Sequence, residues 1–287
     1  MANLRDLRRR IRSVRNTQKI TNAMKLVSGA RLRRAQDAIL AARPYARKLQ
    51  EVLSDLAARA RPGLHALLAE GAPSGAVDLV VVTGDKGLCG SFNSNAFKRS
   101  LAFARERGDG GLRGLHLIGR KGRDLFRRRN LPILSERVDQ FRGLNHERAS
   151  GIARQLCERF TSGATGAVYV VYNEFKSIAQ QRVILERLLP VERAAFAARR
   201  QPPDCLYEPA AEELFARLLP LHVDFQVYRL LLESNAAEQA ARMGAMDAAT
   251  RNASDMIGDL TLHLNRVRQA SITKELIEVI SGADALA

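Results

Sequence analysis

Apolar residues in the N-terminal part of the chain repeat at alternating spacings of three and four. The longest run comprises Leu32, Ala35, Ile39, Ala42, Ala46, Leu49, Leu53 and Leu56, and the same spacing begins upstream at Leu4, Leu7, Ile11 and Val14. A 3.5-residue period kept over several heptads is typical of a coiled-coil seam. The pattern predicts one long helix over residues 1–60, with Asn3 as its N-cap and Arg61-Pro62-Gly63 as its end.

A second helical stripe occupies the C-terminal part of the chain. It runs through Leu230, Ser234, Ala237, Ala241, Gly244 and Ala248, then shifts by one residue to Ala249, Ala253, Met256, Leu260, His263, Val267 and Ala270. A one-residue shift lets a straight helix of 3.6 residues per turn keep facing its partner. The many Ala and Gly residues between positions 237 and 253 favour close approach of two helix backbones.

Between these helices the pattern changes to short aliphatic runs. Four candidate strands, Ala76–Thr83, Leu115–Ile118, Ala167–Tyr172 and Val183–Leu189, alternate with helical stretches at 92–107, 121–129 and 145–160. This alternation predicts a small, mostly parallel α/β sheet. Pro73-Ser74-Gly75 and Gln201-Pro202-Pro203-Asp204 are its expected hinges.

The predicted fold is therefore a long antiparallel coiled coil of N- and C-terminal helices with an inserted small α/β domain. The segments are residues 1–60, 74–205 and 210–287. Because the C-terminal helix is the longer one, about three to five turns of it should extend beyond the N-terminus.

Charge supports the pairing of the two terminal helices. Residues 1–60 contain 15 Lys and Arg with 4 Asp and Glu, whereas residues 210–287 contain 7 and 11. The formal net charge of the whole chain is +16, and an excess of this size predicts an acidic or polyanionic partner.

Basic residues gather in two places. The first cluster lies on the N-terminal helix (Arg8, Arg9, Arg10, Arg12, Arg15, Lys19, Lys25, Arg31, Arg33, Arg34), and the second in the insert (Arg120, Lys121, Arg123, Arg127, Arg128, Arg129). Either can dock an acidic protein or a phosphate, or simply form a solvated face. We favour docking for the first cluster and solvation for the second.

Several kinds of site are not expected. The five histidines (His65, His116, His146, His222, His263) lack metal-ligand spacing, and Cys89, Cys157 and Cys205 lack disulfide spacing. We expect Cys157 to be buried. No apolar run is long enough to span a bilayer, and the Arg-rich N-terminus continues as a helix without the cleavage site of a transit peptide. No catalytic, metal or cofactor-binding residue is predicted.

The loop Thr83-Gly84-Asp85-Lys86-Gly87-Leu88-Cys89-Gly90 leaves two interpretations. Following a strand and preceding a helix, it could present backbone N–H groups to a phosphate. Its glycine spacing fits neither the dinucleotide fingerprint nor the P-loop. We favour a tight turn in which glycines supply positive φ.

Three motifs resemble the gamma subunit of F-type ATP synthases. The first covers residues 13–21, Ala23-Met24-Lys25-Leu26-Val27 and 31–36; the second is Gly87-Leu88-Cys89-Gly90 with Asn93; the third covers residues 268–278 and closes with Ser281-Gly282-Ala283. The first and third are specific to that family. With the length and the order helix, insert, helix, the resemblance covers essentially the whole chain.

The resemblance implies a non-catalytic rotor of the central stalk that couples ion transport to ATP synthesis. In that family one gamma subunit stands inside a ring of three alpha and three beta subunits, and its insert joins an epsilon subunit and the c-subunit ring. It implies a peripheral position on the cytoplasmic face of the bacterial inner membrane.

Residues are assigned by matching motif positions. The resemblance assigns contact with the beta subunits, and coupling, to Met24, Lys25, Arg268, Gln269, Thr273 and Glu275. It assigns an apolar upper pivot to Ile272, Leu276, Ile277, Val279 and Ile280. The chain lacks the dithiol segment of plastid members, so thiol regulation is not expected.

Two other functions remain as alternatives. A basic coiled-coil protein that binds nucleic acid would account for the net charge, and would show a steep salt dependence. It would not account for the motifs or the acidic C-terminal segment, and few aromatic residues are present for base stacking. An enzyme built on the insert would require nucleotide binding by residues 73–205.

Overall fold

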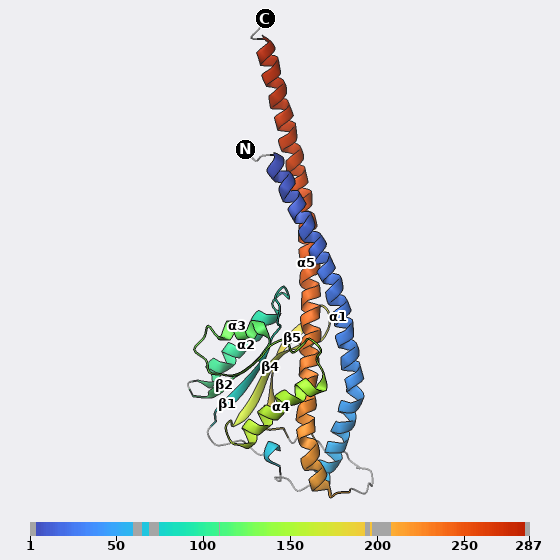
Figure 1. The fold of residues 1–287 in the computed structure, drawn as a ribbon, viewed down its shortest axis with the longest axis vertical. Helices are drawn as coiled ribbons and strands as arrows, with labels where there is room; N and C mark the ends of the chain where they lie inside the picture. The colour runs from blue at the N-terminus through green and yellow to red at the C-terminus, as the bar shows by residue number, and fades with distance from the viewer. Residues whose placement is uncertain are drawn as a thin grey trace. The chain divides into compact units, whose positions relative to one another are not determined.

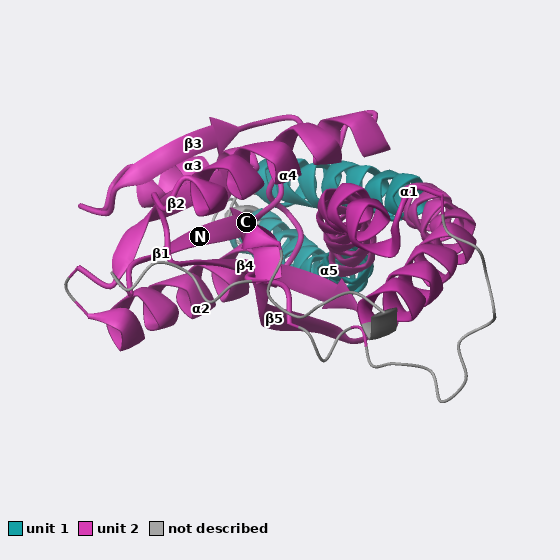
Figure 2. Cartoon of the chain, turned by 90° about the horizontal axis from the view of Figure 1, so that it is seen from below, with its two compact units in different colours: residues 1–28, 243–287 teal, residues 29–242 magenta. Residues whose placement is uncertain are grey.

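The computed structural model describes residues 4–59, 65–68, 75–108, 110–192, 196 and 208–284. The chain divides into two compact units, residues 1–28 with 243–287 and residues 29–242, which Figure 2 shows in different colours. The elements are α1 (Leu4–Arg59), η1 (Ala66–Leu68), β1 (Val77–Val82), α2 (Phe92–Arg107), β2 (Leu112–Ile118), α3 (Arg120–Phe126), β3 (Ile133–Arg137), α4 (His146–Thr161), β4 (Ala167–Phe175), β5 (Gln181–Leu189) and α5 (Ala211–Asp284).

The larger unit, residues 29–242, is built on one five-stranded sheet of order β3-β2-β1-β4-β5 (Figure 1). β3, β2, β1 and β4 are parallel, and β5 is antiparallel to β4. Every residue of the central strand β1 is buried, as expected where helices cover both faces of a parallel sheet. The predicted fold class is confirmed.

Alternate residues of β1 face two separate cores. Val77, Leu79 and Val81 pack with α2 and α3, whereas Val80 and Val82 pack with α4, α1 and α5. The chain crosses one face of the sheet through α2 and α3 and returns across the other through α4. The strand order therefore reverses between β1 and β4, and the loops after these two strands flank the point of reversal.

The coiled-coil pairing of α1 and α5 is also present in this unit. Leu32 and Ala35 of α1 are buried with Ala236 and Ala240 of α5. Leu49, Leu53 and Leu56 join the large core against the first turns of α5. The heptad pattern of the N-terminal helix is therefore confirmed here, and Pro44 lies inside a continuous helix.

In the smaller unit, residues 1–28 and 243–287, the seam is partly polar. Leu7, Ile11, Thr21 and Ser28 are its buried residues on α1. The hydroxyls of Thr21 and Thr250 lie 2.7 Å apart, and Lys25 Nζ lies 2.6 Å from Asp247 Oδ1.

The stripe predicted for α5 was partly wrong in this unit. Gly244, Ala248, Met256, His263 and Ala270 are exposed, whereas Ala253, Leu260 and Val267 are buried or half-buried as predicted. The inward stripe runs through Met246, Thr250, Ala253, Ile257, Leu260, Leu264, Val267 and Ser271. These positions keep an unbroken spacing of four and three, so no one-residue shift occurs. The true seam includes Thr250 and Ser271, which a search for apolar residues passes over.

The other predicted boundaries that fall on described residues agree with the structure to within three residues; α3, for example, ends at Phe126 rather than near position 129. The strand β3 was not predicted. Asn3, Arg61-Pro62-Gly63 and most of the two predicted hinges lie outside the described residues. The division into residues 1–60, 74–205 and 210–287 stays a prediction. Within the described part, none of the helices is both long and apolar enough to cross a lipid bilayer.

Candidate functional site

The six motif residues assigned to partner contact all lie in the smaller unit. Met24 and Lys25 are half-buried on α1, and Arg268, Gln269, Thr273 and Glu275 are exposed on α5. Lys25 binds Asp247, and its hydrogen bond lowers the pKa of that carboxyl group. Lys25 is therefore held by its own chain, while Arg268 has no ion-pair partner among the residues that the structure describes.

Polar side chains near the end of α5 bond mainly within the helix. The Thr273 hydroxyl donates to the Gln269 carbonyl at 2.9 Å, and the Ser271 hydroxyl donates to Glu275 Oε1 at 3.1 Å. These local bonds hold the Ser271, Thr273 and Glu275 side chains in place, and they do not involve the Arg268 guanidinium or the Gln269 side-chain amide. Among the residues that the structure describes, neither group has a side-chain partner.

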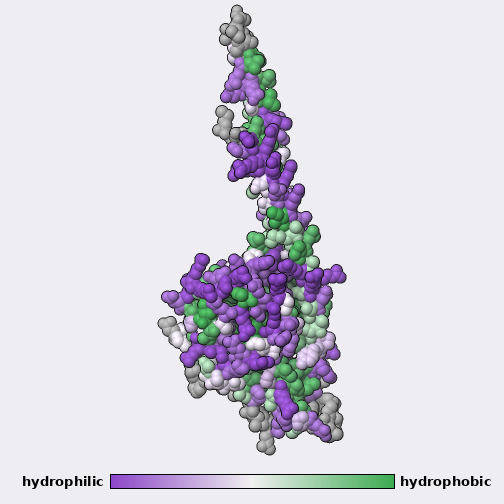
Figure 3. Space-filling model, in the orientation of Figure 1, coloured by the Kyte–Doolittle hydropathy of each residue, from purple (hydrophilic) through white to green (hydrophobic). Residues whose placement is uncertain are grey.

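The residues assigned to the upper pivot form an exposed apolar surface. Ile272, Leu276, Ile277, Val279 and Ile280 are between 49% and 70% exposed. Figure 3 shows hydrophobic atoms along this end of α5. Large apolar side chains gathered on one helix end are typical of a surface that a partner covers.

Sequence reasoning missed a second group of exposed apolar residues in the same unit. Ile20, Leu26 and Val27 of α1 and Met256 and Leu262 of α5 are 51–66% exposed. A signal was present for the three on α1, because they fall between the seam positions of the heptad. Apolar residues off the seam of a coiled coil indicate contact with something other than the partner helix.

The two basic clusters differ in how their charges are paired. In the second cluster Arg120 pairs with Asp139, Arg123 with Asp124 and Arg127 with Glu136. In the described part of the chain, one of the ten residues of the first cluster forms an ion pair, Lys25 with Asp247, against three of the six in the second. This difference supports docking for the first cluster and a solvated face for the second.

The glycine-rich loop after β1 is a closed turn. Gly84 N–H donates to Asn93 Oδ1 at 2.8 Å, and Leu88 and Gly90 adopt positive φ of 61° and 56°. A Cβ atom on Gly84 would lie 2.7 Å from Glu238 Oε1. The Glu238 carboxylate, paired with Arg242, already occupies the space beside Gly84, and the Gly84 N–H is bound to Asn93. The loop is a turn as predicted, but only Gly90 of its three glycines supplies positive φ, and Leu88 supplies the other.

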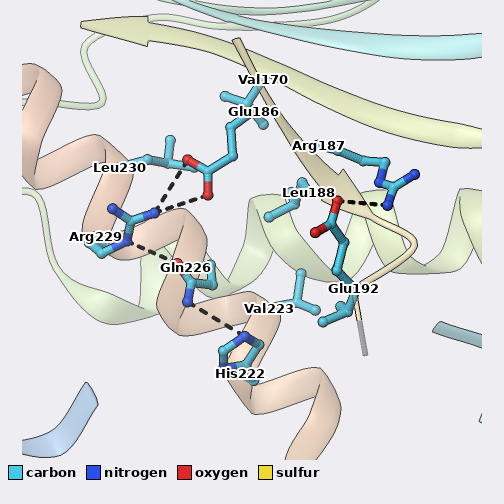
Figure 4. Close-up of a pocket in the computed structure, with 11 residues that line it drawn as sticks. Val170, Glu186, Arg187, Leu188, Glu192, His222, Val223, Gln226, Arg229 and Leu230 are labelled. Atoms are coloured by element: carbon cyan, nitrogen blue, oxygen red, sulfur yellow. Dashed lines mark hydrogen bonds and ion pairs between the residues drawn. The ribbon is translucent and has the colours of Figure 1, made fainter. Parts of the chain in front are cut away.

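A cavity of about 200 Å³ lies between α5 and the strands β4 and β5 (Figure 4). Its polar lining pairs internally: Arg229 lies 3.3 Å from Glu186, and Arg187 lies 2.7 Å from Glu192. Burial, followed by the nearby Arg229, lowers the pKa of His222 to about 4. The cavity brings no nucleophile next to a base.

A buried ion pair ties the sheet to α4. Asp78 of β1 is fully buried, receives a 2.7 Å hydrogen bond from Arg159 Nε, and lies 3.3 Å from His116 Nε2. Burial alone would raise the pKa of Asp78, but the hydrogen bonds from His116 and Arg159 outweigh it and lower the pKa. No group of three or more His, Cys, Asp or Glu in the described part of the chain could hold a metal ion.

The two cysteines that the structure describes, Cys89 and Cys157, should react slowly in the folded protein. Cys89 is buried, and Cys157, expected to be buried, is half-buried beside α5; Cys205 lies outside the described residues. Burial, followed by Asp224 and Glu158, raises the pKa of Cys157 to about 12. Burial and Glu238 raise the pKa of Cys89. Since the thiolate is the reactive form, iodoacetamide at mildly alkaline pH should modify neither before unfolding. Peptide mass spectrometry with and without denaturant measures this, and rapid labelling of folded protein would contradict it.

Comparisons with known proteins agree with these features. A family model described as ATP synthase matches residues 3–286. The chain is 50% identical to the ATP synthase gamma chain of Anaeromyxobacter dehalogenans (strain 2CP-C), with all of both chains covered. It is 49% identical to that of Solibacter usitatus (strain Ellin6076), with 99% of each covered.

Solved structures match as well. A central-stalk chain of the Tetrahymena thermophila mitochondrial ATP synthase is 28% identical with a TM-score of 0.60, covering 80% of this chain and 99% of that one. A chain of the Euglena gracilis mitochondrial ATP synthase has a TM-score of 0.69 at 17% identity, covering 99% of this chain and 94% of that one. The second match supports the fold alone.

Proposed function

Because this chain belongs to the ATP synthase gamma-chain family and is a rotor subunit of the central stalk, we propose that one copy turns inside a ring of three alpha and three beta subunits. The chain does not carry the catalytic residues of the complex; nucleotide chemistry takes place on the ring. Its part in ATP synthesis is to transmit rotation.

The physical basis of this coupling is a mismatch of symmetry. A single helical pair has no threefold axis, so three chemically identical sites around it meet three different faces of the rotor. Each face stabilises a different conformation of the site that it touches. Rotation then passes that bias from one site to the next, which couples the shaft angle to nucleotide affinity.

We assign contact with the beta subunits to Met24, Lys25, Arg268, Gln269, Thr273 and Glu275, and the upper pivot to Ile272, Leu276, Ile277, Val279 and Ile280. The exposed apolar end of α5 is the observation that carries this assignment, since these five side chains lack cover in the smaller unit. The unpaired basic residues of α1 suit acidic partner segments. Exposed charge contacts are weak and screened by salt, which suits a surface that must release each partner in turn.

The sheet-bearing unit, residues 29–242, is assigned to different partners. We propose that it binds the epsilon subunit and the c-subunit ring, on the cytoplasmic face of the bacterial inner membrane. In this arrangement the torque of the membrane ring enters the chain through the sheet and leaves it through the helices.

Native mass spectrometry of the complex that co-purifies with tagged chain from source membranes tests the proposal. We expect one copy beside three alpha and three beta subunits, with epsilon present and ATPase activity in the same fraction. A lone chain, or a complex with nucleic acid, would contradict the rotor function and favour a basic coiled-coil binding protein.

Removing two of the assigned contacts should weaken coupling. Arg268→Ala combined with Thr273→Ala is expected to lower ion-driven ATP synthesis about tenfold, equivalent to about 1.4 kcal/mol shared by two surface contacts. Both side chains are exposed, so helix content and melting temperature should not change. Arg266→Ala on the same helix is the matched control. Unchanged synthesis in the double variant would remove these residues from the contact surface.

A further inference from the structure

The glycine-rich loop and α5 meet at a buried ion pair that the contact surface does not use. Arg242 Nη2 lies 2.5 Å from Glu238 Oε1, and their side chains are 8% and 5% exposed. The same guanidinium nitrogen also donates to the Gly87 carbonyl at 3.4 Å. A buried pair between neighbouring turns of one helix thus also holds a loop of the sheet.

We propose that the Gly84–Gly87 loop and the Glu238–Arg242 pair form a lock that fixes α5 against rotation relative to the sheet and carries torque between them. This inference rests on the proposed function, in which torque enters through the sheet. Gly84, Glu238 and Arg242 act here as positioning residues, because they touch no substrate.

The loop fits the helix too closely to slide past it. The Cβ position of Gly84 lies 2.7 Å from Glu238 Oε1 and 2.8 Å from its Cδ. A side chain on Gly84 would require the carboxylate end of Glu238 to move, and the pairing of that carboxylate with Arg242 opposes the movement. If α5 turned about its own axis, the Glu238 carboxylate would be driven into the loop backbone or withdrawn from it.

The loop itself is braced from the sheet side. Asn93 accepts from Gly84 N–H, and its amide donates to Cys89 Sγ at 3.2 Å. Asn173 of β4 donates to the Phe92 carbonyl at 3.4 Å. Cys89 and Phe92 pack directly on Ala237. Displacement of the loop would therefore disturb β4 and α2 as well.

The position of the lock in the sheet supports a mechanical role. Open parallel sheets hold their ligands at the carboxyl ends of the strands, where the strand order reverses. Here that place, beyond the ends of β1 and β4, is filled by α5: Phe175 at the end of β4 packs on Ala236 and Ala240, and on Ala237 and Ala241. The helix occupies the crevice in which a cofactor would otherwise bind.

The chemistry of the contact explains why it resists twist. Apolar packing is non-directional, so it opposes separation more than it opposes sliding. Glu238 and Arg242 lie on the same helix and turn together, so rotation of α5 would break the hydrogen bond from Arg242 to the Gly87 carbonyl rather than the ion pair. A buried donor that loses its acceptor is costly, so this directional bond within an otherwise apolar contact adds resistance to rotation.

The test compares two alanine substitutions in one loop, each in the complete ATP synthase. Gly84→Ala collides with Glu238, whereas Gly87→Ala meets nothing closer than Lys121 Cε at 3.8 Å. We expect Gly84→Ala to reduce ion-driven ATP synthesis about tenfold, because the added methyl group displaces Glu238 and with it the contact between α5 and the loop. ATP hydrolysis by the detached head should not change, because no torque then passes through the sheet. Gly87→Ala should behave as wild type in both assays.

A third variant separates the lock from a general loss of fold. Glu238→Asp withdraws the carboxylate by one methylene, so the double variant Gly84→Ala, Glu238→Asp should recover synthesis relative to Gly84→Ala alone. The torsional stiffness between the c-ring and the head, measured on single molecules, should fall in the Gly84→Ala variant. It should rise again in the double variant.

Three results would overturn the lock: normal synthesis and stiffness in an assembled Gly84→Ala enzyme, equal losses of synthesis and detached-head hydrolysis, or no recovery in the double variant. Failure of the wild-type chain to assemble with a ring would instead contradict the proposed function. The two failures are therefore distinguishable.

Discussion

Replacing Asp78 with alanine is expected to lower the free energy of unfolding by about 3 kcal/mol, because the change leaves the Arg159 guanidinium in a largely buried site without its carboxylate. Asp78 is fully buried and holds Arg159 at 2.7 Å, while His116 lies 3.3 Å away on the neighbouring strand. Denaturant titration followed by circular dichroism measures the change.

The matched control is an exposed ion pair in the same unit. Asp124, whose side chain is 46% exposed, pairs with Arg123, and Asp124→Ala should change stability by less than about 0.5 kcal/mol. If the two variants unfold at the same denaturant concentration, Asp78 is not a stabilising centre of the sheet.

The Asp78 pair also has a defined pH dependence. The pKa of Asp78 is lowered in the folded protein from an ordinary value of 3.8. Its contribution is therefore present above that ordinary value, and it is lost as the pH falls through the folded-state pKa.

Acidification from pH 6.5 towards pH 4 should remove about 3 kcal/mol of stability through His222 alone. The folded protein holds this imidazole neutral down to a pKa of about 4, because burial and the neighbouring Arg229 disfavour its charged form. The unfolded chain takes up the proton near pH 6.5. Since the unfolded state binds more protons in this window, stability falls as the pH falls.

The substitution His222→Gln isolates this effect. The side chain packs against Phe196 at 5.1 Å between ring centroids and lies 3.5 Å from the Gln226 amide nitrogen. The variant should lose less stability than wild type over the same pH interval, measured as denaturant midpoints at each pH. His263→Gln, at an exposed position, is the control. A wild-type slope in His222→Gln would show that the burial of this histidine does not govern the acid response.

The parts of the fold that the sequence predicted are those with a strong and uniform pattern. β1 is a continuous aliphatic run because both its faces are covered. The strand β3 lies at the sheet edge and alternates between half-buried and exposed residues. Because it contains the polar residues Ser135 and Glu136, it lacks the continuous aliphatic run by which the other strands were predicted. The seam of α5 was misplaced because Thr250 satisfies its hydroxyl by bonding to Met246 and Thr21, so a polar residue can occupy an inward position.

The candidate sites likewise differ in how far the sequence could predict them. Motif residues such as Arg268 could be named because they lie together in the sequence. The lock could not be predicted, because Gly87 and Arg242 are 155 residues apart and their contact depends on how the sheet packs on α5. A single carboxylate within an aliphatic strand indicated that Asp78 needs a buried partner. The sequence could not identify those partners, because they lie on β2 and α4.

The direction of β5 determines where the chain enters and leaves the sheet. Because β5 runs antiparallel to β4, the first residue of the sheet, Val77, and the last, Leu189, lie at the same end of the strands. Only β4 lies between them. Two strand spacings separate those residues by about 10 Å, a gap that about three residues of extended chain can bridge. The sheet can thus be excised from, or spliced into, a helical hairpin without rethreading either helix. In chain order the sheet is therefore a single insertion between α1 and α5.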